Sequence, residues 1–113
     1  MVVVWYGRSI ERVDKNMKKQ IEQGIRKIAD YYGVDYYGIV GQQDKTIEEC
    51  AELIQAISKL KYEEYDMTIK NVIEEMADVQ IMLKQMFYLL DCEKDVKKVM
   101  AYKVNRQLKR IGK

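Results

Sequence analysis

The stretch at residues 46–57 reads TIEECAELIQAI, and the stretch at residues 72–81 reads VIEEMADVQI. In both stretches apolar residues recur at intervals of three and four, as in an amphipathic α-helix with one buried face. Each stretch also contains two acidic residues three positions apart, which lie on the same side of a helix. The two pairs are Glu49 with Glu52 and Glu75 with Asp78. We therefore expect two helices that each carry a pair of carboxylates.

Both acidic pairs fall inside or beside the apolar face of their helix. Helical geometry places Glu49 in one stripe with Leu53, and it places Glu75 in one stripe with Val79. Burying an unpaired carboxylate costs several kcal/mol, so a positive charge has to lie among the four acids. A hard divalent cation bound through oxygen ligands would supply this positive charge. We expect Mg²⁺, with Mn²⁺ able to substitute for it. The alternative is a structural network in which Lys or Arg side chains of other helices neutralise the acids.

The sequence contains no histidine, which restricts the chemistry that is open to the protein. Ser-His-Asp and Cys-His nucleophile systems are excluded, and so are the Glu-x-x-His pairs of di-iron helix bundles. The two cysteines, Cys50 and Cys92, are far apart in the sequence and lie in apolar helical context, so we expect buried free thiols. Any metal must therefore be held by oxygen ligands.

The 113-residue chain is long enough for one domain with a single core, which we assign to residues 1–113. Apolar residues make up 48% and charged residues 34%, and proline is absent, so long helices are permitted nearly everywhere. Periodicity predicts four helices, with Gly33 terminating the first and Asp44 capping the second. The four helices cover about residues 9–32, 45–61, 68–90 and 95–111. The predicted fold is an all-α four-helix bundle. Residues 1–43 form an N-terminal arm and helix, whose first seven residues are a short strand or an ordered arm, and residues 44–111 form the motif-bearing helices.

Charge is unevenly distributed along the chain, although the net charge is only +2. Residues 1–43 carry a net charge of +2, residues 44–93 a net charge of −7, and residues 94–113 a net charge of +7. Either the basic C-terminal helix neutralises the acidic helices by packing beside them, or the acidic segment holds a cation and the basic helix binds phosphate. The small net charge predicts no membrane or polyanion partner, with DNA binding by the basic helix as a minor alternative. No apolar run approaches the roughly 20 residues of a membrane-spanning helix, and we expect a cytoplasmic protein.

The spacing of the acidic residues resembles the signature of the MazG-like, all-α nucleoside triphosphate pyrophosphohydrolases. The pattern reads EExxE at residues 48–52 and, after 22 residues, ExxD at residues 75–78. The resemblance covers about residues 42–111 and includes a closing KVNR at residues 103–106. It implies a Mg²⁺-dependent enzyme that cleaves a (deoxy)nucleoside triphosphate between the α- and β-phosphates, releasing the monophosphate and pyrophosphate, in nucleotide-pool sanitation. It also implies a homodimer or homotetramer built through helices.

The resemblance assigns roles to individual residues. By motif position the Mg²⁺ ligands would be Glu49, Glu52, Glu75 and Asp78. Glu48 would be a supporting acid, and either Glu48 or Glu49 would orient or deprotonate the attacking water. The residues expected to contact the substrate are Gln43, Lys45, Lys103, Asn105 and Arg106. For these five residues the alternative is ordinary surface polarity. The tyrosines at residues 31–37 either wall a base pocket or pack at a subunit interface.

A second class of function stays open on the sequence alone. The acidic helices could belong to a non-catalytic helical interaction protein, in which the carboxylates form an ion-pair network inside an oligomer. Under that interpretation Mg²⁺ does not change the thermal stability of the protein, whereas a resident metal site raises it.

Overall fold

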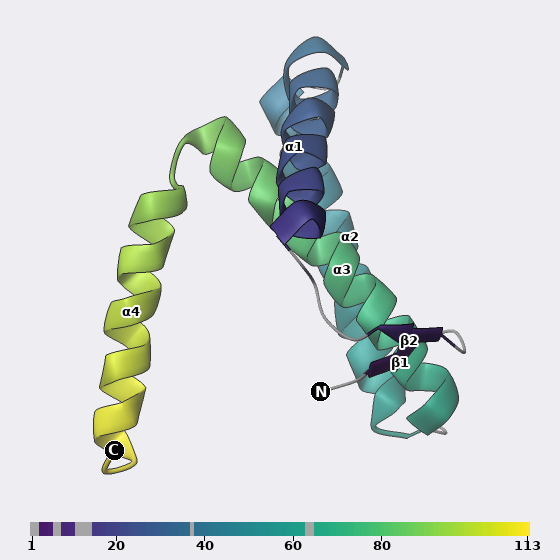
Figure 1. The fold of residues 1–113 in the computed structure, drawn as a ribbon, viewed down its shortest axis with the longest axis vertical. Helices are drawn as coiled ribbons and strands as arrows, with labels where there is room; N and C mark the ends of the chain where they lie inside the picture. The colour runs from purple at the N-terminus through teal and green to yellow at the C-terminus, as the bar shows by residue number, and fades with distance from the viewer. Residues whose placement is uncertain (1–2, 6–7, 11–14, 37, 63–64) are drawn as a thin grey trace.

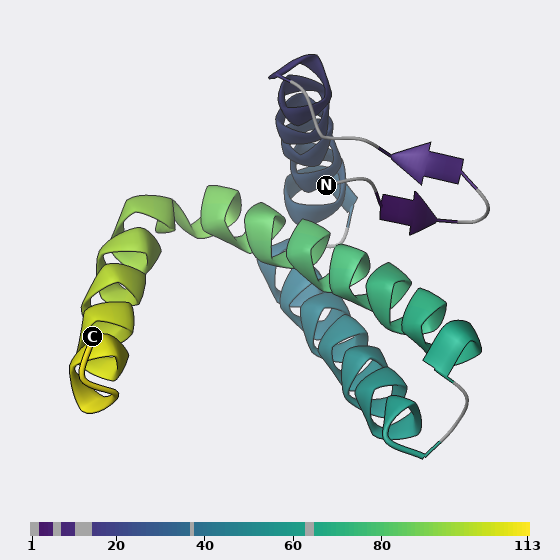
Figure 2. The same cartoon turned by 60° about the horizontal axis from the view of Figure 1, so that its bottom comes forward.

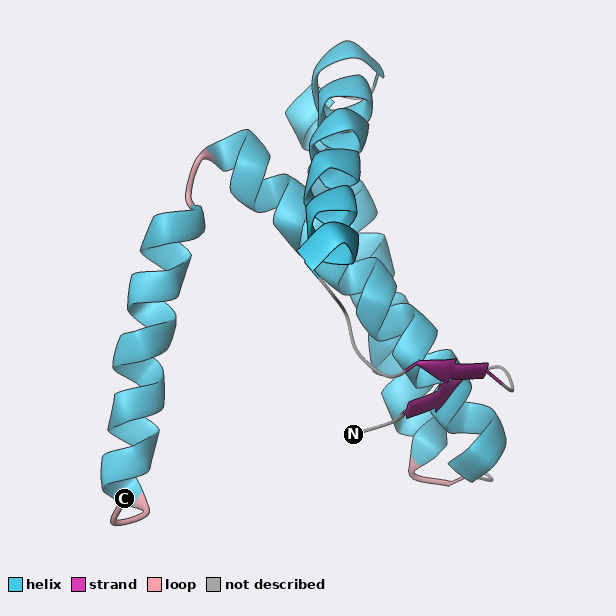
Figure 3. Ribbon diagram, in the orientation of Figure 1, coloured by secondary structure: helices cyan, strands magenta, loops and turns pink. Residues whose placement is uncertain are grey.

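The computed structural model describes residues 3–5, 8–10, 15–36, 38–62 and 65–113, and α-helices dominate them (Figures 1 and 3). The helices are α1 (Lys15–Asp30), α2 (Gly38–Leu60), α3 (Tyr65–Leu90) and α4 (Glu93–Arg110). A π-helical segment, Tyr31–Tyr36, follows α1 directly. The predicted all-α class is confirmed, and the predicted number of α-helices agrees with the described part of the chain.

A short hairpin precedes the helices. It consists of β1 (Val3–Trp5) and β2 (Arg8–Ile10), which are antiparallel with Val3 opposite Ile10. The prediction of a helix that starts at residue 9 is therefore wrong, and its residues 11–14 lie outside the described residues. β-Branched residues favour extended backbone, and valines occupy positions 2–4.

Three of the helices pack against one another. Helices α2 and α3 form an antiparallel pair, and α1 also packs against α3 (Figure 2). The buried apolar residues come from these three helices and are Ile25, Ala29, Ala56, Val72, Val79 and Met82. Three polar residues, Gln42, Thr68 and Gln85, are buried with them. Small side chains at positions such as Ala56 allow α2 and α3 to approach closely, and the predicted acidic pairs lie at this contact.

The segment that leads into α2 differs from the prediction. Helix α2 begins at Gly38, which has a left-handed φ of 74°, so Asp44 lies inside the helix and is not its N-cap. The predicted loop over residues 34–43 is therefore largely helical, and the predicted boundary at residue 43 falls within α2. The reason is a tertiary contact, because Gln42 is buried against α3 and keeps this part of the chain helical.

Gly33 has a different role from the predicted one. It lies inside the π-helical segment without a left-handed φ, so it does not terminate α1 in the way a C-cap glycine does. A Cβ atom at this position would lie only 2.6 Å from Leu89 Cδ1. Glycine suits this position because the Tyr31–Tyr36 segment approaches the end of α3 closely, and a larger residue would require Leu89 to shift.

Helix α4 leaves the other three helices after a turn at Asp91, which has a φ of 50° (Figure 1). No residue of α4 is buried. The predicted four-helix bundle is therefore not formed within one chain, because α4 projects away from the helices that it was expected to cover. Within the described residues, every helix is too short or too polar to cross a lipid bilayer.

Candidate metal centre

Three of the predicted metal ligands meet between α2 and α3. One carboxylate oxygen each of Glu49, Glu52 and Glu75 lies within 4.8 Å of the other two. Glu49 and Glu52 are three residues apart on α2, and Glu75 faces them from α3 because the two helices run side by side. We call these three residues the acidic cluster. The convergence of acids from both motifs at one place was predicted from their helical stripes.

The fourth predicted ligand, Asp78, borders the acidic cluster. It is exposed and lies one turn beyond Glu75 on α3. Its negative charge nevertheless acts on the cluster, since it contributes to raising the pKa of both Glu49 and Glu75. Asp78 therefore lies close enough to the cluster to influence it electrostatically, without being one of the three acids that converge.

Two carboxylate oxygens of the cluster are buried without a hydrogen-bond partner in the described part of the chain. They are Oε2 of Glu49 and Oε2 of Glu75. A buried polar atom without a partner costs free energy, and the cost is greater when the group is charged. Such atoms fit a cation that supplies the missing partner. An all-oxygen set of carboxylates is also the donor set that Mg²⁺ and Mn²⁺ prefer. The residues present therefore fit the predicted metal.

The protonation behaviour of the cluster agrees with this environment. Burial, followed by the charges of Glu52 and Asp78, raises the pKa of Glu49 above its ordinary value of 4.5. The same causes in the same order raise the pKa of Glu75. Carboxylates that repel one another hold protons more tightly than free carboxylates do. A divalent cation bound among them would reverse this tendency.

Lys45 provides the positive charge next to the cluster. Its Nζ atom lies 3.3 Å from Oε1 of Glu48 and 3.8 Å from Oε1 of Glu49. The hydrogen bond and the charge of Glu48 raise the pKa of Lys45. Among the described residues, no lysine or arginine forms an ion pair with Glu52 or Glu75. The alternative of a basic network that neutralises the acids is thus limited, in this part of the chain, to one lysine at the edge of the cluster.

The other predicted site residues lie in three different places. Glu48 is exposed beside the cluster, where it binds Lys45. Gln43 is exposed on α2. The remaining three, Lys103, Asn105 and Arg106, are exposed on α4, and the guanidinium of Arg106 lies 5.7 Å from the ring centre of Tyr102. One chain therefore brings Lys45 to the acidic cluster and leaves the three residues of α4 away from it (Figure 1).

The structure also places residues near the cluster that the sequence analysis did not select. Gln42 and Gln85 are buried and joined by a hydrogen bond from Gln42 Nε2 to Gln85 Oε1. Both line a pocket that also contains Lys45 and Tyr32. Gln85 could have been recognised in the same way as the acidic residues. It is a polar residue in the apolar stripe that contains Met82.

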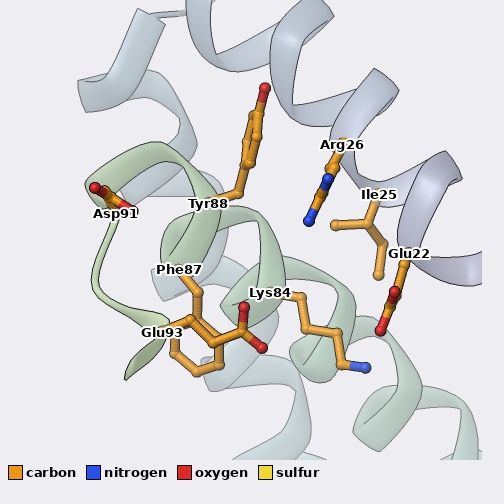
Figure 4. Close-up of a pocket in the computed structure, with 8 residues that line it drawn as sticks. All are labelled: Glu22, Ile25, Arg26, Lys84, Phe87, Tyr88, Asp91 and Glu93. Atoms are coloured by element: carbon orange, nitrogen blue, oxygen red, sulfur yellow. The ribbon is translucent and has the colours of Figure 1, made fainter. Parts of the chain in front are cut away.

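A separate hollow lies between α1, the end of α3 and the start of α4 (Figure 4). Arg26 and Lys84 face it together with three acids, Glu22, Asp91 and Glu93. The hydroxyl of Tyr88 donates a hydrogen bond of 2.8 Å to Oδ1 of Asp30 at this place, and the Arg26 guanidinium lies 5.9 Å from the centre of the Tyr88 ring. The charged side chains that line this hollow are of both signs, so it offers no concentrated charge for a metal or a phosphate.

No known protein family, curated protein or solved structure matches this chain significantly. The resemblance to MazG-like enzymes consequently rests on the motif residues of the sequence alone.

Proposed function

We propose that this protein is a Mg²⁺-dependent nucleotide pyrophosphohydrolase, which cleaves a (deoxy)nucleoside triphosphate between its α- and β-phosphates. The observation that carries the proposal is the acidic cluster, in which Oε2 of Glu49 and Oε2 of Glu75 are buried with no hydrogen-bond partner among the described residues. The spacing of these acids in the sequence, which resembles the MazG-like motif, supports the same conclusion. Pyrophosphate release from surplus or non-canonical nucleotides in the cytoplasm is the cellular role that fits best.

The acidic residues at this place would have different roles in such a site. Glu49, Glu52 and Glu75 would hold Mg²⁺, with Asp78 beside them as the fourth candidate ligand. Mg²⁺ neutralises phosphate oxygens and lowers the pKa of water, which is the chemistry that phosphoryl transfer needs most. Glu48 or a carboxylate of the cluster orients the attacking water and accepts its proton. The lack of histidine is no obstacle, since positioning and charge contribute more to this reaction than a covalent nucleophile does.

Lys45 is suited to contact the substrate phosphates at this site. It is exposed on one side and bound to two glutamates on the other, so its ammonium group is held near the cluster without being buried. A lysine in this position offers a point charge to a phosphate oxygen. The other predicted phosphate-binding residues, Lys103 and Arg106, would have to come from α4 of a second copy.

A second copy is also the partner that the exposed apolar residues favour. Val40, Ile47 and Ile54 follow one another along α2 at seven-residue spacing and expose 70%, 66% and 65% of their surfaces. A row with this spacing on one face of a helix is typical of a helix–helix seam. Helix α4 adds a second uncovered face, with Val99, Met100 and Val104 exposed. The proposal therefore includes a homodimer or homotetramer, in which helices of neighbouring copies complete the bundle.

The same exposed faces favour a second candidate function, a non-catalytic helical interaction protein. In that case the carboxylates of the acidic cluster form ion pairs within an oligomer and take no part in a reaction. The two candidates differ in how they respond to metal, because only a metal-dependent enzyme requires a divalent cation among its carboxylates.

The test is pyrophosphate and orthophosphate release from a panel of canonical and modified nucleotides, with Mg²⁺ and with a chelator. We expect pyrophosphate without orthophosphate, lost on chelation and lost in Glu75→Gln. Glu22→Gln, an exposed glutamate on α1, is the matched control and retains activity. No release from any nucleotide, together with a melting temperature that Mg²⁺ leaves unchanged, would reject the enzyme and favour the interaction protein.

A further inference from the structure

A pocket of about 260 Å³ lies where α1, α2 and α3 meet. Its lining residues come from all three helical layers and from the π-helical segment, and they are Ile28, Tyr32, Gln42, Lys45, Met82 and Gln85. Gln42 and Gln85 are the most enclosed polar members, since each exposes only 2% of its surface. Ile28 and Tyr32 are much more exposed, so the two amides lie deep in the pocket and the α1 side forms its open wall.

Lys45 connects the pocket with the acidic cluster. It lines the pocket, and its Nζ atom lies 3.8 Å from Oε1 of Glu49. On α3, Met82 of the pocket follows Asp78 after one helical turn. A molecule whose phosphates lie at the acidic cluster would therefore extend past Lys45 into this pocket.

The pocket walls have a distinct chemical character. Tyr32, Met82 and Ile28 supply an aromatic ring, a polarisable thioether and an aliphatic side chain, which together suit a flat, weakly polar group. The amides of Gln42 and Gln85 add neutral donors and acceptors. The hydrogen bond between them uses one donor hydrogen of Gln42 and one lone pair of Gln85, and Gln85 Nε2 donates a second hydrogen bond of 3.5 Å to Sδ of Met82. Since an amide has two donor hydrogens and two lone pairs, each glutamine keeps one donor hydrogen and at least one lone pair for a ligand.

We propose that this pocket binds the base of the nucleotide and that Gln42 and Gln85 read its hydrogen-bonding edge. The proposal rests on the proposed function, because the phosphates of the same nucleotide are placed at the acidic cluster. A nucleobase is flat and presents alternating donors and acceptors, and a glutamine amide can pair with two of them at once. A phosphate group does not suit these walls, because the lining side chains other than Lys45 at the pocket edge are neutral amides or largely apolar groups.

The competing explanation is that the two amides only connect α2 to α3. Buried polar side chains are normally hydrogen-bonded, and Gln42 and Gln85 satisfy this requirement with one another. The two explanations differ in one measurable respect. A structural pair affects stability and acts equally on every substrate, whereas a base-reading pair changes the preference among bases.

The first experiment measures kcat/KM with Mg²⁺ for ATP, GTP, CTP, UTP and base-free ribose 5-triphosphate. Gln42→Met and Gln85→Met are compared with Gln55→Met, an exposed glutamine of the same helix as Gln42. We expect both pocket variants to reduce the ratio between the best and the worst base by about tenfold or more, because lost hydrogen bonds are the strongest source of such discrimination. The base-free substrate should change much less. Unchanged base ratios in folded pocket variants would overturn the proposal, even if hydrolysis itself is established.

A second experiment does not need turnover, a metal or a variant of the amides. Free nucleosides are added to the wild-type protein in the presence of a chelator, and the methionine methyl resonances are followed by NMR, with Met82→Leu to assign Met82 and Met100 on α4 as the control. We expect the Met82 resonance to shift with a base-dependent amplitude, and ribose alone to have no effect. An unchanged Met82 resonance at millimolar nucleoside would overturn the base pocket. A shift without hydrolysis of any nucleotide would support the pocket and reject the proposed reaction.

Discussion

Lys45 Nζ lies 3.8 Å from Oε1 of Glu49, and this contact joins the acidic cluster to the pocket that contains Gln42 and Gln85. The same ammonium group lies 3.3 Å from Oε1 of Glu48. Lys45 therefore partly neutralises the carboxylates on its side of the cluster. Glu75, on the α3 side, has no lysine or arginine ion-pair partner in the described part of the chain.

The first prediction concerns Lys45 itself. Lys45→Met removes a cation that opposes the repulsion among the glutamates, so we expect at most a small loss of metal-free stability, because exposed ion pairs contribute little. We also expect KM for a triphosphate to rise by more than kcat falls. Steady-state kinetics and thermal melts check both parts. Lys59→Met, on the same helix, is the control and should change neither. If Lys45→Met alters folding and leaves KM unchanged, Lys45 is structural only.

The second prediction is an unusual pH dependence without metal. The pKa values of Glu49 and Glu75 are raised above 4.5 by burial and by neighbouring acids. The folded protein therefore binds these protons more tightly than the unfolded chain does. Lowering the pH from 7 to about 5 should then raise the melting temperature in a chelator. Calorimetry at stepped pH values measures this. The rise should become smaller in Glu75→Gln and persist in Glu22→Gln, and a melting temperature that falls steadily over this range would contradict the assignment.

The third prediction is that Mg²⁺ stabilises the folded protein in competition with protons. A ligand at 100 times its Kd adds about 2.7 kcal/mol, which corresponds to a shift of several degrees in a domain of this size. We expect this shift at pH 7.5 and a smaller one at pH 5.5, because protons compete for the same carboxylates. Glu49→Gln and Glu75→Gln should abolish it, and both should be more stable than wild type without metal. Isothermal titration calorimetry with MgCl₂ or MnCl₂ gives an independent measure, in which an equal heat from Glu75→Gln would exclude the cluster as the site.

The fourth prediction addresses the exposed row on α2. Ile47 and Ile54 lie at seven-residue spacing on a face that α3 does not cover. Ile47→Asp and Ile54→Asp place a charge in the proposed seam, so we expect the protein to dissociate to monomers at micromolar concentration. Light scattering after size exclusion measures the mass, and Gln55→Asp is the control on another face of the helix. A wild-type protein that is monomeric and still hydrolyses nucleotides would reject the oligomeric part of the proposal.

Features that depend on local sequence, such as the faces on which the acidic pairs lie, could be predicted from the sequence. Features that depend on contacts between distant segments could not. The two acidic pairs could be placed because helical periodicity puts Glu49 and Glu75 on buried faces, and a buried acid needs a partner. The path of α4 could not be predicted, because its amphipathic pattern does not specify whether the covering surface belongs to the same chain. The helical start at Gly38 was also missed, since a run rich in Gly and Tyr favours a loop until the buried contact of Gln42 with Gln85 is known.

The fifth prediction concerns the contact between Gly33, which was expected to terminate the first helix, and Leu89. A Cβ atom on Gly33 would lie 2.6 Å from Cδ1 and 2.9 Å from Cδ2 of Leu89, so Gly33→Ala forces the Leu89 side chain or one of the two segments to move. We expect it to destabilise the protein by about 1–3 kcal/mol, as overpacking does. In Leu89→Ala the colliding atoms are absent, and the same Gly33→Ala change should then cost much less. A double-mutant cycle by denaturant unfolding measures this difference. If Gly33→Ala costs the same in both backgrounds, the close approach between the Tyr31–Tyr36 segment and the end of α3 is not what requires glycine at position 33.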